Sequence, residues 1–243
     1  MRKIIIIGAT SGIGRELARL YIQNGDRVGI TGRRAFLLDE LREQFPLQLV
    51  TECFDVTGCK NIPHLESLIQ KLGGVDVLIY NSGYGQPTEG LDWVVDRQIT
   101  LTNVYGFVEI VNYAYNYFRK QGRGQIVATS SIAALRENSH APAYSASKAF
   151  ISMYMGSIYL KAGRLKKRNP EIDISITDIL PGFVKTKMAR SKKLFWEAPL
   201  DKAARQIFNA IQKKKRKVYI THRWAIIAWL LKWMPFFILK RLA

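Results

Sequence analysis

The sequence predicts an α/β domain in which a parallel sheet is covered by helices on both faces. Short apolar segments rich in β-branched residues alternate with longer amphipathic segments from the first residue onward. The short segments are apolar enough to be covered on both sides, which is typical of parallel strands. The chain has 243 residues, a length that one such domain can fill with a complete core. We therefore expect a single α/β domain.

The order of the segments predicts the topology. The expected strands are residues 3–7, 27–31, 47–54, 76–80, 125–129, 173–179 and 218–221. The expected helices are residues 12–24, 35–44, 62–72, 91–119, 144–168 and 200–213. Because crossovers between parallel strands are right-handed, this alternation predicts a doubly wound, seven-stranded sheet. Residues 1–222 would form the domain, and residues 223–243 would form an apolar, basic, helical C-terminal extension.

A glycine-rich turn follows the first strand directly. Gly8, Gly12 and Gly14 lie between a run of isoleucines and an amphipathic helix. Glycine is needed there because a Cβ would block either the turn or the approach of backbone N–H groups to an anion. A strand, a glycine turn and a helix N-terminus together form a Rossmann-like site for the pyrophosphate of a dinucleotide.

The end of the second strand predicts which dinucleotide binds. A carboxylate there would accept hydrogen bonds from the ribose hydroxyls and repel a 2′-phosphate, whereas a guanidinium would bind that phosphate. The sequence has Arg33 and Arg34 at this point and no acid. Cations at the start of a helix oppose the helix dipole, which favours a bound anion beside them. We therefore expect NADP(H).

Tyr144 and Lys148 are four residues apart in the segment AYSASK and would share one face of a helix. Hydride transfer to a carbonyl carbon leaves an alkoxide that must receive a proton. A phenol has a pKa near 10, too high for easy exchange at neutral pH, and a neighbouring ammonium would lower that pKa. Thirteen residues before Tyr144, the hydroxyl of Ser131 could polarise the carbonyl, with Ser130 as the less favoured alternative.

The glycine spacing and the AYSASK segment together resemble the short-chain dehydrogenase/reductase family over residues 1–222. The family's fingerprint TGxxxGxG is present except that Ile7 replaces the threonine. The resemblance implies a catalytic tetrad of Asn103, Ser131, Tyr144 and Lys148. Asn103 would hold a water in the proton relay, and Lys148 would also hold the nicotinamide ribose.

The resemblance also implies the positions that contact the nucleotide. In the first turn these are Gly8, Thr10, Ser11, Gly12, Ile13 and Gly14. Around the adenosine they are Arg33, Arg34, Asp55 and Val56, although Asp55 could equally be an ordinary turn residue. Near the nicotinamide they are Asn81, Gly83, Tyr144, Lys148, Pro181, Gly182, Val184 and Thr186. Tyr80 and Ser82 depart from the family's NNAG, so only its second Asn and its Gly carry over.

We expect an NADP(H)-dependent oxidoreductase acting on a carbonyl or alcohol substrate. The segment KMARSKKLFWEAP, residues 187–199, stands where the family places its substrate lid, and its apolar residues favour a hydrophobic ketone or aldehyde. The family commonly pairs subunits through its fourth and fifth helices, so the resemblance implies a homodimer or homotetramer. The alternative is a catalytically silent nucleotide-sensing or membrane-surface module on the same fold.

The charge is concentrated at the C-terminal end of the chain. Of the net charge of +18, most comes from residues 161–243, which contain 21 Lys and Arg against 5 Asp and Glu. Residues 224–239 are apolar apart from Lys232 but shorter than the roughly 20 residues that a spanning helix needs. We expect a helix, broken at Pro235, that lies on an anionic lipid surface or packs over the substrate cleft or a second subunit.

Composition excludes several other classes. With 48% hydrophobic and 23% charged residues the chain is neither disordered nor wholly embedded in a membrane. Cys53 and Cys59 suggest neither a disulfide framework nor a metal site, so we expect no metal and a reducing, cytoplasmic location, with membrane contact only at the surface. The basic clusters lie at expected helix ends, apart from the aromatic residues, which argues against a nucleic-acid partner.

Overall fold

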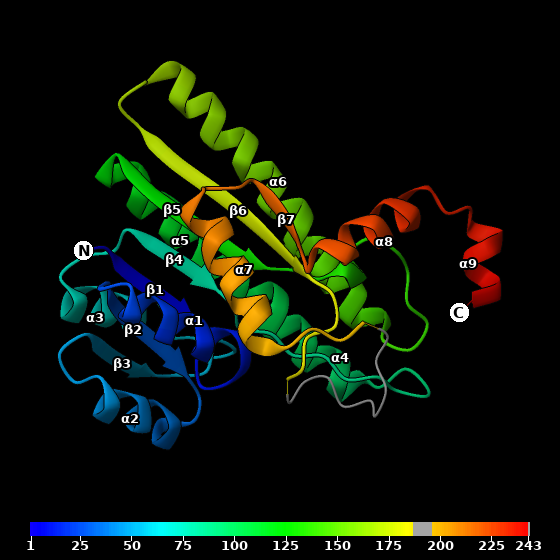
Figure 1. Cartoon of the computed structure of the whole chain (residues 1–243), viewed down its shortest axis with the longest axis horizontal. Helices are drawn as coiled ribbons and strands as arrows, with labels where there is room; N and C mark the ends of the chain where they lie inside the picture. Colours follow the sequence, from blue (N-terminus) through cyan, green and yellow to red (C-terminus); the bar gives the residue numbers. More distant parts are fainter. Residues whose placement is uncertain (187–195, 243) are drawn as a thin grey trace.

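The computed structural model describes residues 1–186 and 196–242, and its strands form one parallel, seven-stranded sheet (Figure 1). The strand order is β3-β2-β1-β4-β5-β6-β7, which confirms the predicted doubly wound topology. The strands are β1 (Lys3–Ile7), β2 (Arg27–Gly32), β3 (Leu49–Cys53), β4 (Val77–Tyr80), β5 (Arg123–Thr129), β6 (Asp173–Pro181) and β7 (Lys217–Ile220).

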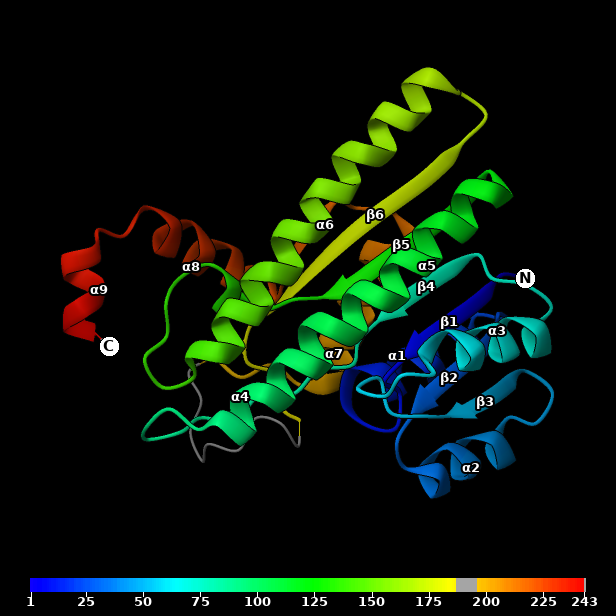
Figure 2. The same cartoon turned by 180° about the vertical axis from the view of Figure 1, so that it is seen from behind.

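Helices cover both faces of the sheet. Figure 1 looks onto the face that carries α1 and α7, and Figure 2 looks onto the face that carries α3, α5 and α6. The helices are α1 (Gly12–Gln23), α2 (Ala35–Gln44), α3 (Asn61–Leu72), α4 (Trp93–Thr100), α5 (Gly106–Gln121), α6 (Pro142–Arg168), α7 (Leu200–Gln212), α8 (His222–Trp233) and α9 (Phe236–Leu242). A short 3₁₀ turn, η2 (Ile132–Ala134), precedes α6.

The first strand explains why the sheet needs helices on both sides. Its four consecutive isoleucines, residues 4–7, are all fully buried. Side chains alternate across a strand, so Ile4 and Ile6 pack with α1, α2 and α7, whereas Ile5 and Ile7 pack with α3, α5 and α6. A strand without a polar face is stable only between two apolar layers.

The expected helix over residues 91–119 is divided by a π turn, η1 (Leu101–Tyr105). The backbone N–H of Gly106 bonds to the carbonyl of Leu101, five residues earlier, instead of to the residue four earlier. The hydroxyl of Tyr80 donates to the carbonyl of Thr102 over 2.6 Å inside this turn. Tyr80 therefore satisfies a buried backbone acceptor, which gives a structural reason for its departure from the family's asparagine.

The C-terminal segment forms two helices after β7. α8 and α9 are separated at Pro235, whose ring and missing N–H cannot continue a helix. Among the described residues, none of the helices has the length and apolarity needed to cross a bilayer. Residues 187–195 of the expected substrate lid lie outside the described residues, and the division of the chain at residue 222 stays a prediction.

Candidate active site

The candidate site lies at the carboxyl ends of the strands, where the strand order reverses between β1 and β4. In open α/β sheets ligands bind in the crevice at this switch point. Gly8 directly follows β1, Asn81 directly follows β4, and Ser131 lies two residues after β5. The predicted residues therefore come to one edge of the sheet although they are far apart in the sequence.

The turn after β1 requires glycine at two positions. Gly8 has a φ of 85°, and a Cβ added to it would lie 2.7 Å from the Cα of Ser82. A Cβ on Gly14 would overlap the carbonyl oxygen of Gly8. The methyl group of Thr186 lies 3.5 Å from the place where a Cβ on Gly12 would stand, so the segment after β6 reaches this turn.

Asn81 ties three strands together beside the glycine turn. Its amide nitrogen donates to the carbonyl of Gly8 over 2.9 Å, and its amide oxygen accepts from the hydroxyl of Thr129 over 3.2 Å. These bonds link the carboxyl ends of β1, β4 and β5. Asn81 thus fixes the backbone of the predicted nucleotide cleft.

The two arginines after β2 point to different partners. Arg34 donates from Nη2 to the hydroxyls of Thr10 and Ser11 over 2.5 and 2.9 Å, which brings its guanidinium to the glycine turn. Arg33 lies 3.4 Å from the carboxylate of Asp55, and both side chains are exposed. An exposed pair of this kind contributes roughly 0–1 kcal/mol, so Arg33 is only weakly held.

Tyr144 and Lys148 lie in the first turns of α6 and face the end of β5. The ammonium of Lys148 is 5.7 Å from the centroid of the Tyr144 ring and donates to the carbonyl of Thr129 over 2.9 Å. The hydroxyl of Ser131 lies close enough to the Tyr144 hydroxyl to lower the pKa of that phenol. The structure therefore brings together three members of the predicted tetrad.

Asn103 lies in the π turn and is fully buried. Its amide oxygen accepts from the backbone N–H of Tyr84 over 2.8 Å, and its amide nitrogen donates to the carbonyl of Tyr84 and the hydroxyl of Ser147 over 2.8 and 2.9 Å. The side chain thus holds the loop after β4 against α6. A Cβ on Gly83 would stand 3.2 Å from the Lys148 ammonium and 3.7 Å from the Asn103 amide oxygen, so this loop lies against both residues.

Burial moves the pKa values of the tyrosine and the lysine in opposite directions. Loss of water around the ammonium lowers the pKa of Lys148 to about 8, and the carboxylate of Asp178 acts against this by raising it. Loss of water around the phenol raises the pKa of Tyr144, and the nearby hydroxyl of Ser131 lowers it. The expected lowering by Lys148 is therefore not the dominant influence on Tyr144 in this structure.

Asp178, in the middle of β6, is a site residue that sequence reasoning missed. It is almost fully buried and accepts from the hydroxyls of Ser130 and Ser152 over 2.5 and 2.7 Å, with the ammonium of Lys217 at 3.6 Å. Ser130 is thus occupied with Asp178, which leaves Ser131 as the serine beside Tyr144. An acid inside the apolar segment ISITDILP was the available signal, because a buried carboxylate needs partners.

Gly85 is the second residue that sequence reasoning missed. The ring of Tyr144 lies against the backbone of Gly85, because a Cβ there would overlap Cδ2 and stand 2.8 Å from Cε2 of that ring. The segment NSGYGQ contains a second glycine close to Gly83, which was the signal.

The other predicted residues take varied positions. Asp55 accepts from the N–H of Thr57 over 3.0 Å, as a turn residue does, while the carbonyl of Val56 accepts from Asn61 over 2.9 Å. Ile13 packs against the core on the side of α1. Pro181 ends β6, Gly182 lies against the indole of Trp224, and Val184 pairs with Ala198. Within residues 1–186 and 196–242, no three His, Cys, Asp or Glu side chains gather as a metal site would require.

Comparisons with known proteins agree with this geometry. The family model described as short chain dehydrogenase matches residues 2–195. An uncharacterized oxidoreductase of Myxococcus xanthus is 34% identical over 193 residues, which cover 77% of this chain and 74% of that protein. A short chain dehydrogenase from Burkholderia cenocepacia in complex with NADP has a TM-score of 0.82 at 20% identity, covering 99% of this chain and 97% of that one. A 3-ketoacyl-(acyl-carrier-protein) reductase from Brucella melitensis complexed with NADH has a TM-score of 0.79 at 18% identity, covering 90% and 96% of the two chains. With a family model that spans most of its length and the matching fold, the chain belongs to the short-chain dehydrogenase family of oxidoreductases.

Proposed function

We propose that the protein is an NADP(H)-dependent oxidoreductase that transfers a hydride between nicotinamide and a carbonyl or alcohol substrate, with a hydrophobic ketone or aldehyde as the carbonyl form. The observation that carries this proposal is the cluster of polar groups at the ends of β4 and β5. The hydroxyl of Ser131 lies beside that of Tyr144, the Lys148 ammonium lies beside the same ring, and Asn103 holds the facing loop. Such a cluster can polarise a carbonyl and deliver a proton to it.

The residues around the first turn fit a dinucleotide. The turn can take this conformation only because Gly8 and Gly14 have no side chain, since a Cβ on either would meet the protein's own backbone. The first turn of α1 contains no acid, and the hydroxyl of Ser11 does not cap it, so its N–H groups can bind a pyrophosphate. When bound, the nicotinamide would supply the hydride to the carbonyl carbon or accept it from the alcohol.

Each member of the cluster has a role in carbonyl reduction. Ser131 would donate a hydrogen bond to the carbonyl oxygen, and Tyr144 would give its proton to the same oxygen. Lys148 would stabilise the phenolate that remains, since a pKa of about 8 leaves most of the lysine protonated at neutral pH. Asn103 would anchor the relay to solvent by holding the loop over the lysine.

The two arginines support the choice of NADP(H). Arg34 is the N-cap residue of α2, its guanidinium has no acceptor for the helix N–H groups, and the first turn of α2 contains no acid. The N–H groups at this helix start and both guanidinium groups can therefore bind a 2′-phosphate at the adenosine ribose. Arg33 can leave Asp55 for the phosphate at little cost, because the pair is exposed.

We also propose a homodimer or homotetramer that pairs through α5 and α6. Apolar side chains on the outer surface of α6 support this interface, because Met153 is 74% exposed and Leu160 is 59% exposed. The location that we propose is the cytoplasm. Cys53 and Cys59 are free and exposed thiols, which suit a reducing compartment.

The test is a panel of ketones and aldehydes assayed with NADPH and with NADH, in which oxidation of the reduced nicotinamide is followed by absorbance. We expect turnover of hydrophobic carbonyl compounds with NADPH in clear preference to NADH. Nucleotide binding without turnover of any member of the panel would instead support the catalytically silent alternative.

A further inference from the structure

Helix α8 is held to the rest of the protein by one of its faces. Trp224 and Ala228 on this face are 5% and 1% exposed, and both belong to a small apolar cluster with Ile132. Ile227 and Leu231 complete the same face and are partly buried. The spacing of these four residues is that of one side of an α-helix. The buried face therefore fixes the orientation of α8 on the body of the protein.

The opposite face of α8 is also apolar, and it continues into α9. We define the docking face as the exposed apolar residues of these two helices. They are Ile226 (63% exposed), Trp229 (62%), Leu230 (47%), Trp233 (75%), Phe236 (65%), Phe237 (65%) and Ile238 (37%). A helix that is apolar on all sides is stable only between two apolar environments. The body of the protein provides one of them, so a partner must provide the other.

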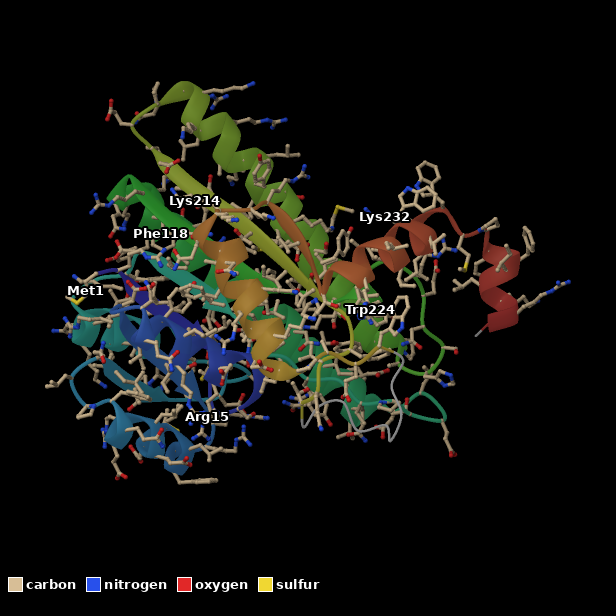
Figure 3. The ribbon with its side chains drawn as sticks, viewed as in Figure 1. Met1, Arg15, Phe118, Lys214, Trp224 and Lys232 are labelled. Atoms are coloured by element: carbon tan, nitrogen blue, oxygen red, sulfur yellow. The ribbon has the colours of Figure 1, made fainter. Side chains whose placement is uncertain are left out.

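The two helices of the docking face are positively charged. From Thr221 to the last residue, the chain contains four Lys and Arg (Arg223, Lys232, Lys240 and Arg241) and no Asp or Glu. Lys232, labelled in Figure 3, lies on α8 with its ammonium 5.8 Å from the ring of Tyr219, and Lys240 and Arg241 lie in the last turn of α9. A partner for this face must therefore combine apolar surface with negative charge.

A second copy of the chain does not meet this requirement. In a twofold interface the same patch meets itself. Pairing of two docking faces would bring the cations of α8 and α9 against those of the second copy. Neither copy has an Asp or Glu in these two helices to neutralise them. An anionic bilayer does meet the requirement, because Trp and Phe side chains enter the headgroup region while Lys and Arg contact the acidic headgroups. The dimensions also fit, since α8 has 12 residues and is suited to lie along a bilayer surface.

Helix α8, which carries the docking face, begins beside the candidate active site. The indole of Trp224 lies against the backbone of Gly182, at the end of β6, and its cluster partner Ile132 directly follows Ser131. Figures 1 and 2 show α8 and α9 extending from the edge of the sheet where the strands end, with α9 standing away from the other described elements. A surface that receives these helices would therefore also lie next to the mouth of the site.

We propose that α8 and α9 bind the protein to an anionic lipid bilayer and that the site takes its carbonyl substrate from that bilayer. The second part rests on the proposed oxidoreductase function, whereas the first part does not. Trp229 and Trp233 would enter the headgroup region, and Lys232, Lys240 and Arg241 would contact acidic headgroups.

The first experiment measures sedimentation of the full-length protein with vesicles of phosphatidylcholine, with and without phosphatidylserine. We expect the wild type to bind to the anionic vesicles. In the variant Trp229→Ala/Trp233→Ala, the affinity for these vesicles should fall on the order of tenfold per tryptophan. Trp93→Ala is the matched control, because Trp93 is also 75% exposed but lies on α4. In the double variant Lys240→Gln/Arg241→Gln, the affinity should fall roughly fivefold per removed charge, and only for the anionic vesicles. Equal binding of wild type and the tryptophan variant, or no binding of wild type, would overturn the proposal.

Light scattering after size exclusion tests the competing occupant. Loss of the oligomer in Trp229→Ala/Trp233→Ala without lipid would show that a second copy covers the docking face, and an unchanged mass supports the lipid surface. The substrate part is tested with a short aldehyde in water and a long-chain aldehyde in anionic vesicles. We expect Trp229→Ala/Trp233→Ala to reduce the short aldehyde at the wild-type rate. Its rate with the long-chain aldehyde in vesicles should fall at least about tenfold. Equal rates with both aldehydes would refute delivery from the bilayer. If wild type reduced neither aldehyde, the oxidoreductase proposal would fail while vesicle binding would still decide the docking proposal.

Discussion

The contact between Gly85 and Tyr144 predicts that one added methyl group will disable the site. In Gly85→Ala the new Cβ would stand 2.8 Å from Cε2 and 3.1 Å from Cγ of the tyrosine ring, and it would overlap Cδ2. Carbon atoms in contact are separated by about 3.5–4.0 Å, so the ring must retreat by roughly 1 Å. Retreat would move its hydroxyl away from the hydroxyl of Ser131.

The expected size of the effect follows from this displacement. A misplacement of about 1 Å at a reacting group can reduce the rate about 100-fold. We therefore expect kcat/KM for carbonyl reduction to fall about 100-fold in Gly85→Ala, with overpacking lowering the free energy of unfolding by roughly 1–3 kcal/mol. Nucleotide affinity should change little, because the glycine turn after β1 is untouched.

The assay combines steady-state reduction, nucleotide binding and thermal unfolding. Gly90→Ala is the matched control, since a Cβ on Gly90 meets no described atom within 4 Å and the residue lies on the same loop. In the Tyr144→Phe background, Gly85→Ala should cause little further loss, because both changes act on the same phenol. Wild-type turnover in Gly85→Ala, or a full 100-fold loss on top of Tyr144→Phe, would refute this reasoning.

Three further predictions concern the cluster and the arginines. Tyr144→Phe should lower kcat by about 10²–10⁴-fold while nucleotide binding persists, which titration of nucleotide fluorescence checks; full activity would contradict its role as proton donor. Arg33→Ala and Arg34→Ala should each lower the affinity for NADPH by roughly 10–100-fold and the affinity for NADH far less. Equal losses of affinity for the two nucleotides would count against the phosphate contact. The pKa of Lys148 is about 8, so the reduction rate should fall as the pH rises through that value and the ammonium loses its proton. The carboxylate of Asp178 raises this pKa, so in Asp178→Asn the reduction rate should fall at a lower pH than in the wild type. An unchanged pH–rate profile in this variant would exclude the coupling between Asp178 and Lys148.

Local patterns were sufficient to predict most of the fold and the main cluster. The alternation of apolar and amphipathic segments gave the seven strands and their parallel order. The spacing of Tyr144 and Lys148 placed both on one face of α6, and the distance from Ser131 selected the serine that the structure places at the phenol. Each of these inferences depends on periodicity or on positions at strand ends, which short stretches of sequence contain.

The features that sequence reasoning missed depend on contacts between distant segments. Gly85 matters because of a ring that belongs to α6, and Asp178 matters because of two serines on other elements. The π turn was missed because residues 101–105 contain no glycine or proline that would interrupt a helix, and only the hydrogen bonds distinguish the turn. The different partners of Arg33 and Arg34 likewise depend on side-chain positions that two adjacent arginines do not indicate.

Because of the π turn, the side chain of Asn103 can lie at the site while the buried faces of α4 and α5 keep their orientation toward the sheet. A π turn holds one residue more than the α turn that it replaces, so α4 and α5 keep the faces they would have in an unbroken helix one residue shorter. The surplus residue is absorbed at the level of Asn103, and the apolar face of α5, with Phe107 and Ile110 fully buried, still meets the sheet. Deletion of one residue from this turn would restore a regular α-helix. Its apolar packing would be intact, but the side-chain amide of Asn103 would no longer reach the carbonyl of Tyr84.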